Sequence, residues 1–194
     1  MPIVHHQQFA LRSNYFDHQS NLHGINHTYR VMLHVLNIGQ QAALGDEILH
    51  AWCAAYIHDM ARQHDGYCTQ HGAWAANTKL PLFRDFFMQQ GVDADGLRAI
   101  KAAVANHSVR YELIPQHPYY KITALLKDAD ALDRIRISET NLKVNYLRYP
   151  VTATLVDFAK ALYYATPNKE LTSFAELLQI AESIGGVSFG ELIG

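Results

Sequence analysis

Apolar residues recur every three or four positions through most of this 194-residue chain, and this helical spacing constrains the fold more than any other feature. Between residues 25 and 44, for example, apolar residues recur at Val31, Leu33, Val35, Leu36, Ile38 and Ala42, and no proline interrupts them. No stretch alternates apolar and polar residues ahead of an Asn-Gly or Asp-Gly hairpin turn. The pattern therefore predicts an all-α protein.

Turn-forming residues mark the expected helix ends. Gly45 and Asp46 predict the C-cap of one helix and the N-cap of the next. The segment 63–69 is turn-like, and the proline-containing segment 108–118 is expected to be a loop. The expected helices cover residues 25–44, 46–60, 70–80, 82–89, 95–106, 120–132, 150–164 and 173–184.

The composition excludes several classes of protein. Hydrophobic residues make up 49% of the chain and charged residues 18%, which is typical of a globular domain. The net charge of -2 gives no general attraction to a nucleic acid polymer or an acidic membrane. The longest uninterrupted apolar run, residues 51–57, is far shorter than the roughly 20 residues that span a bilayer. With two cysteines outside any CxxC motif and no signal-peptide pattern, we expect a cytoplasmic protein without a membrane partner.

Histidine is unusually frequent, with 12 residues against 16 lysines and arginines combined. His58 and Asp59 stand together at the end of an apolar helix, and adjacent helical side chains point about 100° apart. They can meet at one ion only if it lies between them, near the helix end. Imidazole and carboxylate ligands together suit Mn, Fe, Co, Ni, Zn or Mg. By itself the pair is better explained as a histidine and aspartate at a helix terminus than as a metal site.

Three longer motifs follow one another around this pair. They are HGxxHxxRV at residues 23–31, HDxxR at residues 58–62 and DGxxxxHGxxAA at residues 65–76. A fourth segment, 127–134, contains the A-D-x-L step Ala129 to Leu132. Together they resemble the HD-domain superfamily, an all-helical metal-dependent group whose ligands follow the order H…HD…D. They are similar to a bacterial subfamily of predicted hydrolases without an assigned substrate.

The resemblance implies a fold, a metal and its ligands. It implies an HD-domain helical bundle holding one or two divalent metal ions. Carried over by position, the ligands are His27, His58, Asp59 and Asp130. With no repeat or linker in the sequence, we expect residues 1–194 to form a single HD-type domain, with a motif core at 22–134 and a C-terminal helical extension at 142–194.

Two further histidines follow the HD pair in sequence. His71 stands near an expected helix start and His107 at an expected helix end. In HD proteins such histidines contact the substrate phosphate or complete a second metal site. Their ordinary structural explanations are a helix cap and a surface histidine. The resemblance assigns catalytic roles to Asp59, Asp130, His71 and His107.

Several cationic residues are candidates for binding a substrate phosphate. Arg30 lies three residues after His27, on nearly the same helical face, and Arg62 lies just past the HD pair. His23 is one helical turn before His27, and either contacts substrate or supports a ligand. An ion pair with a nearby carboxylate is the alternative explanation for each arginine. The predicted substrate-binding set is His23, Arg30, Arg62, His71 and His107.

Two carboxylates and one histidine beside the ligands are left with open roles. Asp128 and Asp133 bracket Asp130, and either can orient a ligand histidine or act as a general base. His34 falls on the His27 face two turns along, where a buried supporting role is expected.

The function implied by the resemblance is metal-dependent phosphohydrolysis. The expected substrate is a nucleotide or another small phosphoester, attacked by a metal-activated water. The first alternative is a dinuclear iron oxygenase, for which His71 and His107 supply the extra histidines, although their distance in sequence from Asp59 is short for that class. The second is a non-catalytic nucleotide-binding HD module. The sequence leaves the substrate, the metal and the oligomeric state open, a homo-oligomer included.

Overall fold

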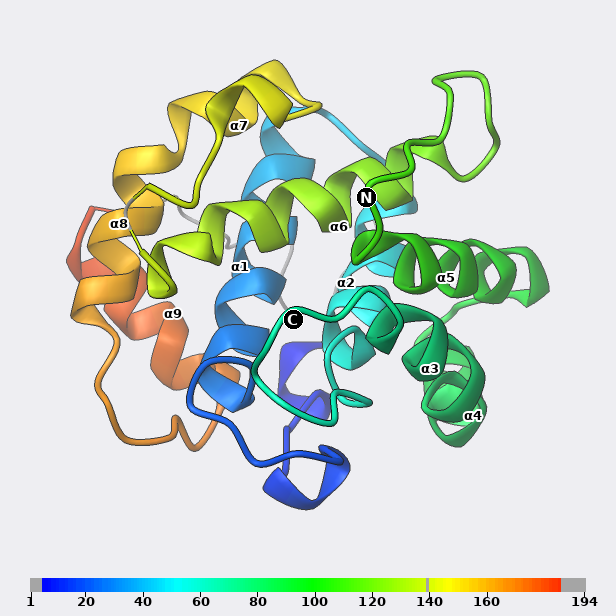
Figure 1. The fold of residues 1–194 in the computed structure, drawn as a ribbon, viewed down its shortest axis with the longest axis horizontal. Helices are drawn as coiled ribbons and strands as arrows, with labels where there is room; N and C mark the ends of the chain where they lie inside the picture. Colours follow the sequence, from blue (N-terminus) through cyan, green and yellow to red (C-terminus); the bar gives the residue numbers. More distant parts are fainter. Residues whose placement is uncertain (1–4, 139, 186–194) are drawn as a thin grey trace.

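The computed structural model describes residues 5–138 and 140–185, which form helices joined by turns and loops without any strand. The all-α prediction is confirmed (Figure 1). The α-helices are α1 (Ile25–Gln41), α2 (Glu47–Ile57), α3 (His71–Thr78), α4 (Leu80–Gln89), α5 (Ala94–His107), α6 (Tyr120–Leu132), α7 (Pro150–Thr154), α8 (Val156–Ala165) and α9 (Phe174–Ser183). The short 3-10 helices are η1 (His6–Gln8), η2 (Ser13–Tyr15), η3 (Asp133–Arg136) and η4 (Val144–Tyr146).

Four helices form the centre of the bundle. Helix α1 packs against α2 and α6, and α5 packs against the same two helices. Helices α3 and α4 lie beside α5 on one side, and α7, α8 and α9 lie beyond α1 and α6 on the other (Figure 1). This arrangement brings the ends of several helices to one place, where the candidate site lies.

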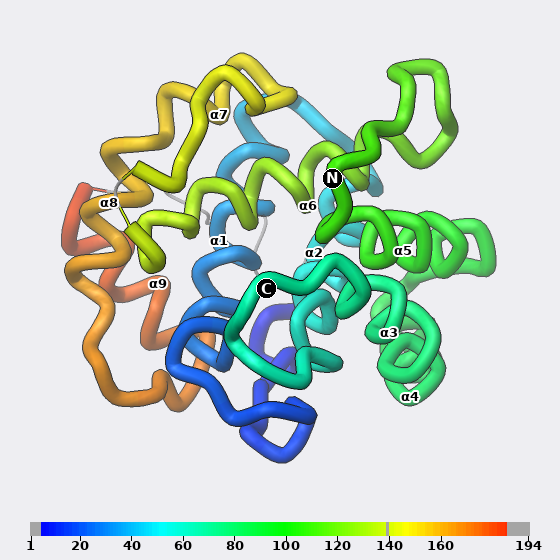
Figure 2. Tube along the Cα trace, viewed as in Figure 1, coloured from blue at the N-terminus to red at the C-terminus, as the bar shows by residue number. Residues whose placement is uncertain are grey.

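The core is built around α2, in which every residue except Glu47 and His50 is buried. Trp52 on this helix contacts Phe9 and Phe174 edge to face, with ring centroids 5.7 and 4.7 Å apart. Phe9 belongs to the N-terminal segment and Phe174 to α9, so both ends of the described chain close onto one core (Figure 2). Truncating one of these buried aromatic side chains to alanine removes about 3–5 kcal/mol of stability.

The end of α1 differs from the sequence expectation. Ala43 adopts the left-handed backbone conformation, with φ 53°, rather than Gly45. The N–H of Leu44 donates to the carbonyl of Gly39 at 2.9 Å, and the helix ends at Gln41, three residues earlier than predicted. Asp46 is the N-cap residue of α2, as predicted, although its side chain makes no capping hydrogen bond.

Two other helix boundaries also differ. Pro81 lies in the first turn of α4, where a missing N–H costs no hydrogen bond, so the helix begins at Leu80 rather than after the proline. The predicted helix 150–164 is divided into α7 and α8 at Leu155. The remaining predicted helices are confirmed to within about three residues, and α6 matches its predicted bounds.

The C-terminal segment packs onto the motif-bearing helices. Helix α8 contacts η3 and α1, and α9 contacts α1 and η1. Residues 186–194 of the expected C-terminal extension lie outside the described residues. None of the helices in the described ranges is long and apolar enough to cross a membrane.

Candidate metal centre

Five helices each bring one part of the predicted site to the centre of the bundle. His27 comes from the first turn of α1, the His58-Asp59 pair follows α2, and Asp130 lies in the last turn of α6. His71 begins α3 and His107 ends α5. His27, His58, His71 and His107 are all buried, with exposed fractions of 6% or less. The structure therefore brings together residues separated by more than 100 positions in sequence.

The four histidines form two close pairs. The Nε2 atoms of His27 and His58 lie 3.1 Å apart, and those of His71 and His107 lie 3.0 Å apart. Each ring is held from behind through its other nitrogen. His58, His71 and His107 donate their Nδ1–H to the carbonyls of Ala55, Cys68 and Val104, and His27 donates its Nδ1–H to Asp133.

Asp59 lies between the two pairs and faces each with a different oxygen. Its Oδ2 is 3.4 and 3.7 Å from the Nε2 atoms of His27 and His58. Its Oδ1 is 3.0 and 3.6 Å from the Nε2 atoms of His71 and His107. Asp130 completes the first group, with its Oδ1 3.5 Å from His27 Nε2. The set thus contains two donor groups that share Asp59, and they are contiguous, because His58 also lies within reach of His107.

The chemistry of this donor set fits divalent metal ions. A neutral histidine ring that carries its proton on Nδ1 has an unprotonated Nε2 with a lone pair. The two Nε2 atoms of each pair face each other. Burial lowers the pKa of His58 to about 3 and also lowers the pKa of His71, so one ring of each pair is neutral at pH 7. Two nitrogens about 3 Å apart have the spacing of adjacent ligands on one ion at about 2.1 Å. Such an ion satisfies both lone pairs.

The carboxylates are ionised and ready to act as ligands. Burial acts to raise the pKa of Asp130, but the positive charge of Arg136 and then the neighbouring histidines lower it below its ordinary value. Burial also acts to raise the pKa of Asp59, but the histidines that surround both of its oxygens lower it below its ordinary value. Both groups therefore offer charged oxygens at neutral pH.

A glycine explains how His71 and His107 come together. Gly72 follows His71, and a Cβ built on it would lie 2.4 Å from the carbonyl oxygen of Val104 and 2.9 Å from His107 Nδ1. Only a residue without a side chain allows the start of α3 to approach the end of α5 this closely. Gly24, beside His23, is also required for close packing, because a Cβ on it would collide with the carbonyl oxygen of Ser20. The two His-Gly steps of the motifs are thus packing requirements.

Asp133 anchors the ligand His27 and neutralises the arginine beside it. Its Oδ2 accepts from His27 Nδ1 at 2.7 Å, and its two oxygens accept from Arg30 at 2.5 and 3.0 Å. Of the two open roles given to Asp133, the geometry matches the orientation of a ligand histidine. The guanidinium of Arg30 is buried and also lies over the ring of Tyr163. The predicted contact between Arg30 and a substrate phosphate stays a prediction, and the ion pair of Arg30 with Asp133 does not favour it.

His23 and Arg62 both contact Asp59. His23 Nδ1 lies 2.9 Å from Oδ2, and the Nε of Arg62 donates to Oδ1 at 3.1 Å. Arg62 also donates to the carbonyls of His64 and Gly66, which fixes the turn after the HD pair. The two side chains therefore position the shared carboxylate, while their predicted contact with substrate stays a prediction.

Arg136 was missed by the sequence reasoning. From η3 its guanidinium lies 3.8 Å from Asp130 and 3.7 Å from Asp133, and 3.2 Å from His23 Nδ1. A basic residue shortly beyond the last ligand was the available signal, but both Arg134 and Arg136 match it. The 3-10 turn that follows α6 decides which one faces the site.

Asp128 and His34 have structural positions. Asp128 is fully buried and accepts from the backbone N–H groups of Arg148 and Tyr149 and from the hydroxyl of Thr152, which attaches the start of α7 to α6. This rules out the ligand-orienting role left open for Asp128. His34 is fully buried and neither ring nitrogen has a hydrogen-bond partner among the described residues. The expected support of a ligand by His34 is therefore not observed.

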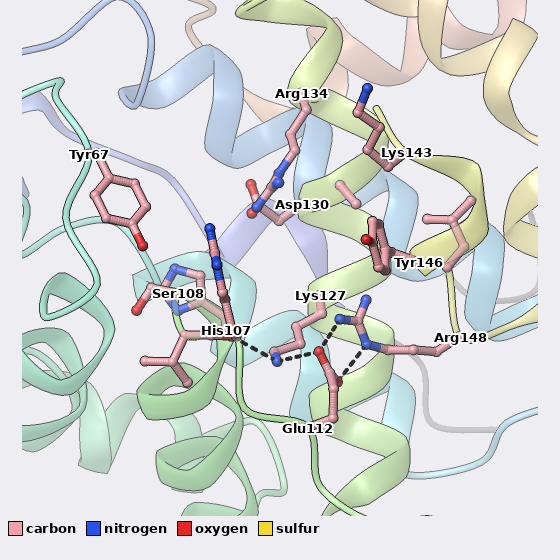
Figure 3. A pocket seen from close by; sticks show the side chains of 14 residues that line it. Tyr67, His107, Ser108, Glu112, Lys127, Asp130, Arg134, Lys143, Tyr146 and Arg148 are labelled. Atoms are coloured by element: carbon pink, nitrogen blue, oxygen red, sulfur yellow. Dashed lines mark hydrogen bonds and ion pairs between the residues drawn. The ribbon is translucent and has the colours of Figure 1, made fainter. Parts of the chain in front are cut away.

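A cavity of about 620 Å³ opens beside the donor cluster, a size typical of small-molecule sites. His107 and Asp130 lie in its wall, so the cavity reaches both donor groups. Figure 3 shows Tyr67 and Tyr146 on opposite sides of the cavity, with Asp130 and Arg134 between them. Its wall carries more basic than acidic side chains, none of which was predicted from sequence except the ligands.

Comparisons with known proteins support the fold. No protein-family model and no curated protein matches the chain. The crystal structure of a predicted HD superfamily hydrolase from an uncultured Thermotogales bacterium matches with a TM-score of 0.51 and 20% sequence identity. The match covers 84% of this chain and 82% of that one. The architecture of this chain is therefore an all-α bundle of the HD-domain type.

Proposed function

We propose that this chain is a metal-dependent phosphohydrolase of the HD superfamily that cleaves a nucleotide or another small phosphoester. The observation that carries the proposal is the contiguous cluster of His and Asp donors around Asp59, which opens onto a cavity with basic walls. Metal donors combined with cationic walls suit a reaction in which negative charge must be bound and stabilised. The likeness to a predicted HD superfamily hydrolase supports the same direction.

The residues of the chain divide between holding ions and handling the substrate. His27, His58, Asp59 and Asp130 would hold one divalent ion, and His71 and His107 would hold a second with Asp59 shared between them. Ions at these places supply Lewis-acid activation of water and neutralise charge on a phosphoryl group. Arg136 and Asp133 keep Asp130 and His27 in position from behind.

The reaction forms a bond between a water oxygen and phosphorus and breaks the ester P–O bond. The proton released by the water ends on the oxygen of the leaving alcohol. Asp130 is the better placed carboxylate for carrying that proton, because its side chain is 14% exposed and lines the cavity, whereas that of Asp59 is 3% exposed. The lowered pKa of Asp130 keeps it in the proton-accepting form.

The test is phosphate release from a panel of phosphoesters by metal-loaded protein. The parent protein is compared with His58→Ala, which removes a buried donor, and with His64→Ala, which removes an exposed histidine outside the cluster. We expect release by the parent and by His64→Ala, and none by His58→Ala. Equal release by His58→Ala and the parent would refute the proposal.

One observation favours a second candidate, an HD-type dinuclear iron oxygenase. Two donor groups that share a carboxylate suit two iron ions as well as they suit two ions of a hydrolase. Protein purified without chelators would then contain two irons per chain and consume dioxygen with an alkyl substrate, and no phosphoester would be cleaved. The remaining alternative, a non-catalytic module, predicts tight nucleotide binding without any product.

A further inference from the structure

Some of the charged side chains that line the cavity form ion pairs with one another. Glu112 accepts from Lys127 at 2.9 Å and from Arg148 at 2.6 and 3.0 Å, and Arg148 also donates to Asp128. Lys127 donates further to the carbonyls of Val109 and Tyr111. These two cations are therefore already bound by the protein (Figure 3). Because Lys127 and Arg148 are already paired, they do not offer a site for an incoming anion.

Three other cations of the wall have no such partner. Arg110, Arg134 and Lys143 line the same cavity, and no carboxylate of residues 5–138 or 140–185 forms an ion pair with any of them. All three side chains are exposed. Figure 3 shows the guanidinium of Arg134 beside Asp130, and the chain of Lys143 on the same side of the cavity. They come from three segments: the loop after α5, η3, and the residue just before η4.

Three exposed cations that face one cavity give it a positive potential, and this potential attracts an anion that can contact all of them. Divalent ions at the donor groups would add positive charge beside them. The phosphoryl group that reacts is bound at those ions, so it leaves Arg110 and Lys143 without a partner. The charge balance of the cavity is met by a substrate with a second anionic group.

We propose that Arg110, Arg134 and Lys143 form a subsite for a second phosphate, so that the substrate is a small bisphosphorylated molecule. One phosphate reacts at the donor groups, and the other is held by the three cations. This inference rests on the proposed function, because it names the substrate class of the same site. Guanidinium groups bind phosphate through paired N–H donors, and the lysine adds a mobile point charge.

The experiment compares matched substrates that differ by one phosphate. The first pair is fructose 6-phosphate and fructose 1,6-bisphosphate, and the second is adenosine 5′-monophosphate and adenosine 3′,5′-bisphosphate. For each compound, KM and kcat are measured with the metal-loaded protein, and Kd is measured by calorimetry. We expect the bisphosphate of each pair to have a KM and a Kd at least about tenfold lower, which is the effect of one charged hydrogen-bonded contact.

Two single variants test the residues. In Lys143→Ala and Arg110→Ala, the preference for bisphosphate over monophosphate falls about five- to tenfold in each. The charge-matched control is Lys101→Ala, which removes an exposed cation of α5 that does not line the cavity and keeps the preference. Arg134 is tested last, because its charge also lowers the pKa of Asp130 and its loss affects the donor cluster.

The outcomes separate this inference from the proposed function. Equal KM and Kd values within each pair, or a preference that survives in both variants, overturn the subsite. If both adenosine compounds bind more tightly than both fructose compounds, with or without the second phosphate, the subsite is also overturned. The binding is then assigned to the exposed tyrosines of the cavity wall. If nothing is hydrolysed, the proposed function fails, and the Kd values alone decide the subsite by the same criteria.

Discussion

Replacing Asp133 with asparagine tests the support behind the first donor group. The carboxylate accepts from His27 Nδ1 and from Arg30, and it lies 3.7 Å from Arg136, all without contact with solvent. Asparagine preserves the volume and one acceptor oxygen. It removes the charge that two arginines face, and its amide N–H groups would meet donors on every side.

The expected effects follow from the burial of this network. Breaking a buried ion pair by removing one partner costs about 3–5 kcal/mol. For a domain of this length, that lowers the melting temperature by roughly 6–20 °C. Losing the residue that orients a ligand histidine also weakens metal binding by about 10- to 100-fold. Asp133→Asn should therefore be less stable without metal and should bind metal more weakly.

Two measurements separate these effects. Thermal unfolding of chelator-treated protein gives the loss of stability, and competition with a chelator of known affinity gives the metal affinity. Asp85→Asn is the control, because Asp85 is an exposed carboxylate of α4 without a described ion pair, and it should match the parent in both assays. An Asp133→Asn protein that binds metal as tightly as the parent would refute the reasoning.

Three further predictions follow from other parts of the structure. Gly72→Ala should push α3 away from α5, so that metal analysis finds one ion per chain fewer than in the parent, and an unchanged metal content would contradict this. Asp128→Ala should lower stability by about 2–4 kcal/mol, because it leaves buried donors at the start of α7 unpaired, yet retain the full metal content. Burial lowers the pKa of His34 to about 4, so the unfolded chain takes up a proton before the folded one as the pH falls from about 6.5 to 4. Chelator-treated protein should therefore lose stability in that range, with His34 contributing about 2 kcal/mol of the loss at pH 5. Urea unfolding of His34→Leu should show a smaller loss between pH 7 and pH 5 than the parent, and an equal loss would count against the explanation.

The sequence was a good guide where local patterns decide the structure. The spacing of apolar residues predicts α6 to its last residue, and the unbroken apolar segment of α2 predicts a buried helix. The end of α1 was misplaced because Gly45 is a stronger local signal than Ala43. The hydrogen bond from Leu44 to Gly39 nonetheless closes the helix earlier, with Ala43 in the left-handed conformation.

The site was predictable only in part, because its side-chain contacts join residues that are far apart in sequence. The motifs place His27, His58, Asp59 and Asp130 in one cluster, and the structure brings them together. Spacing alone could not tell that Arg30 faces Asp133, 103 positions away, rather than a substrate. The cations of the cavity come from segments without any motif, so nothing local in the sequence marks them.

The most direct test of the central claim is anomalous diffraction from crystals of the protein grown with manganese. The account predicts two anomalous peaks. One lies among His27, His58 and Asp130, and the other lies against His71 and His107, with Asp59 between the two peaks. The absence of any peak at these donors would contradict the claim that this cluster is a metal centre, and a single peak would contradict its division into two groups.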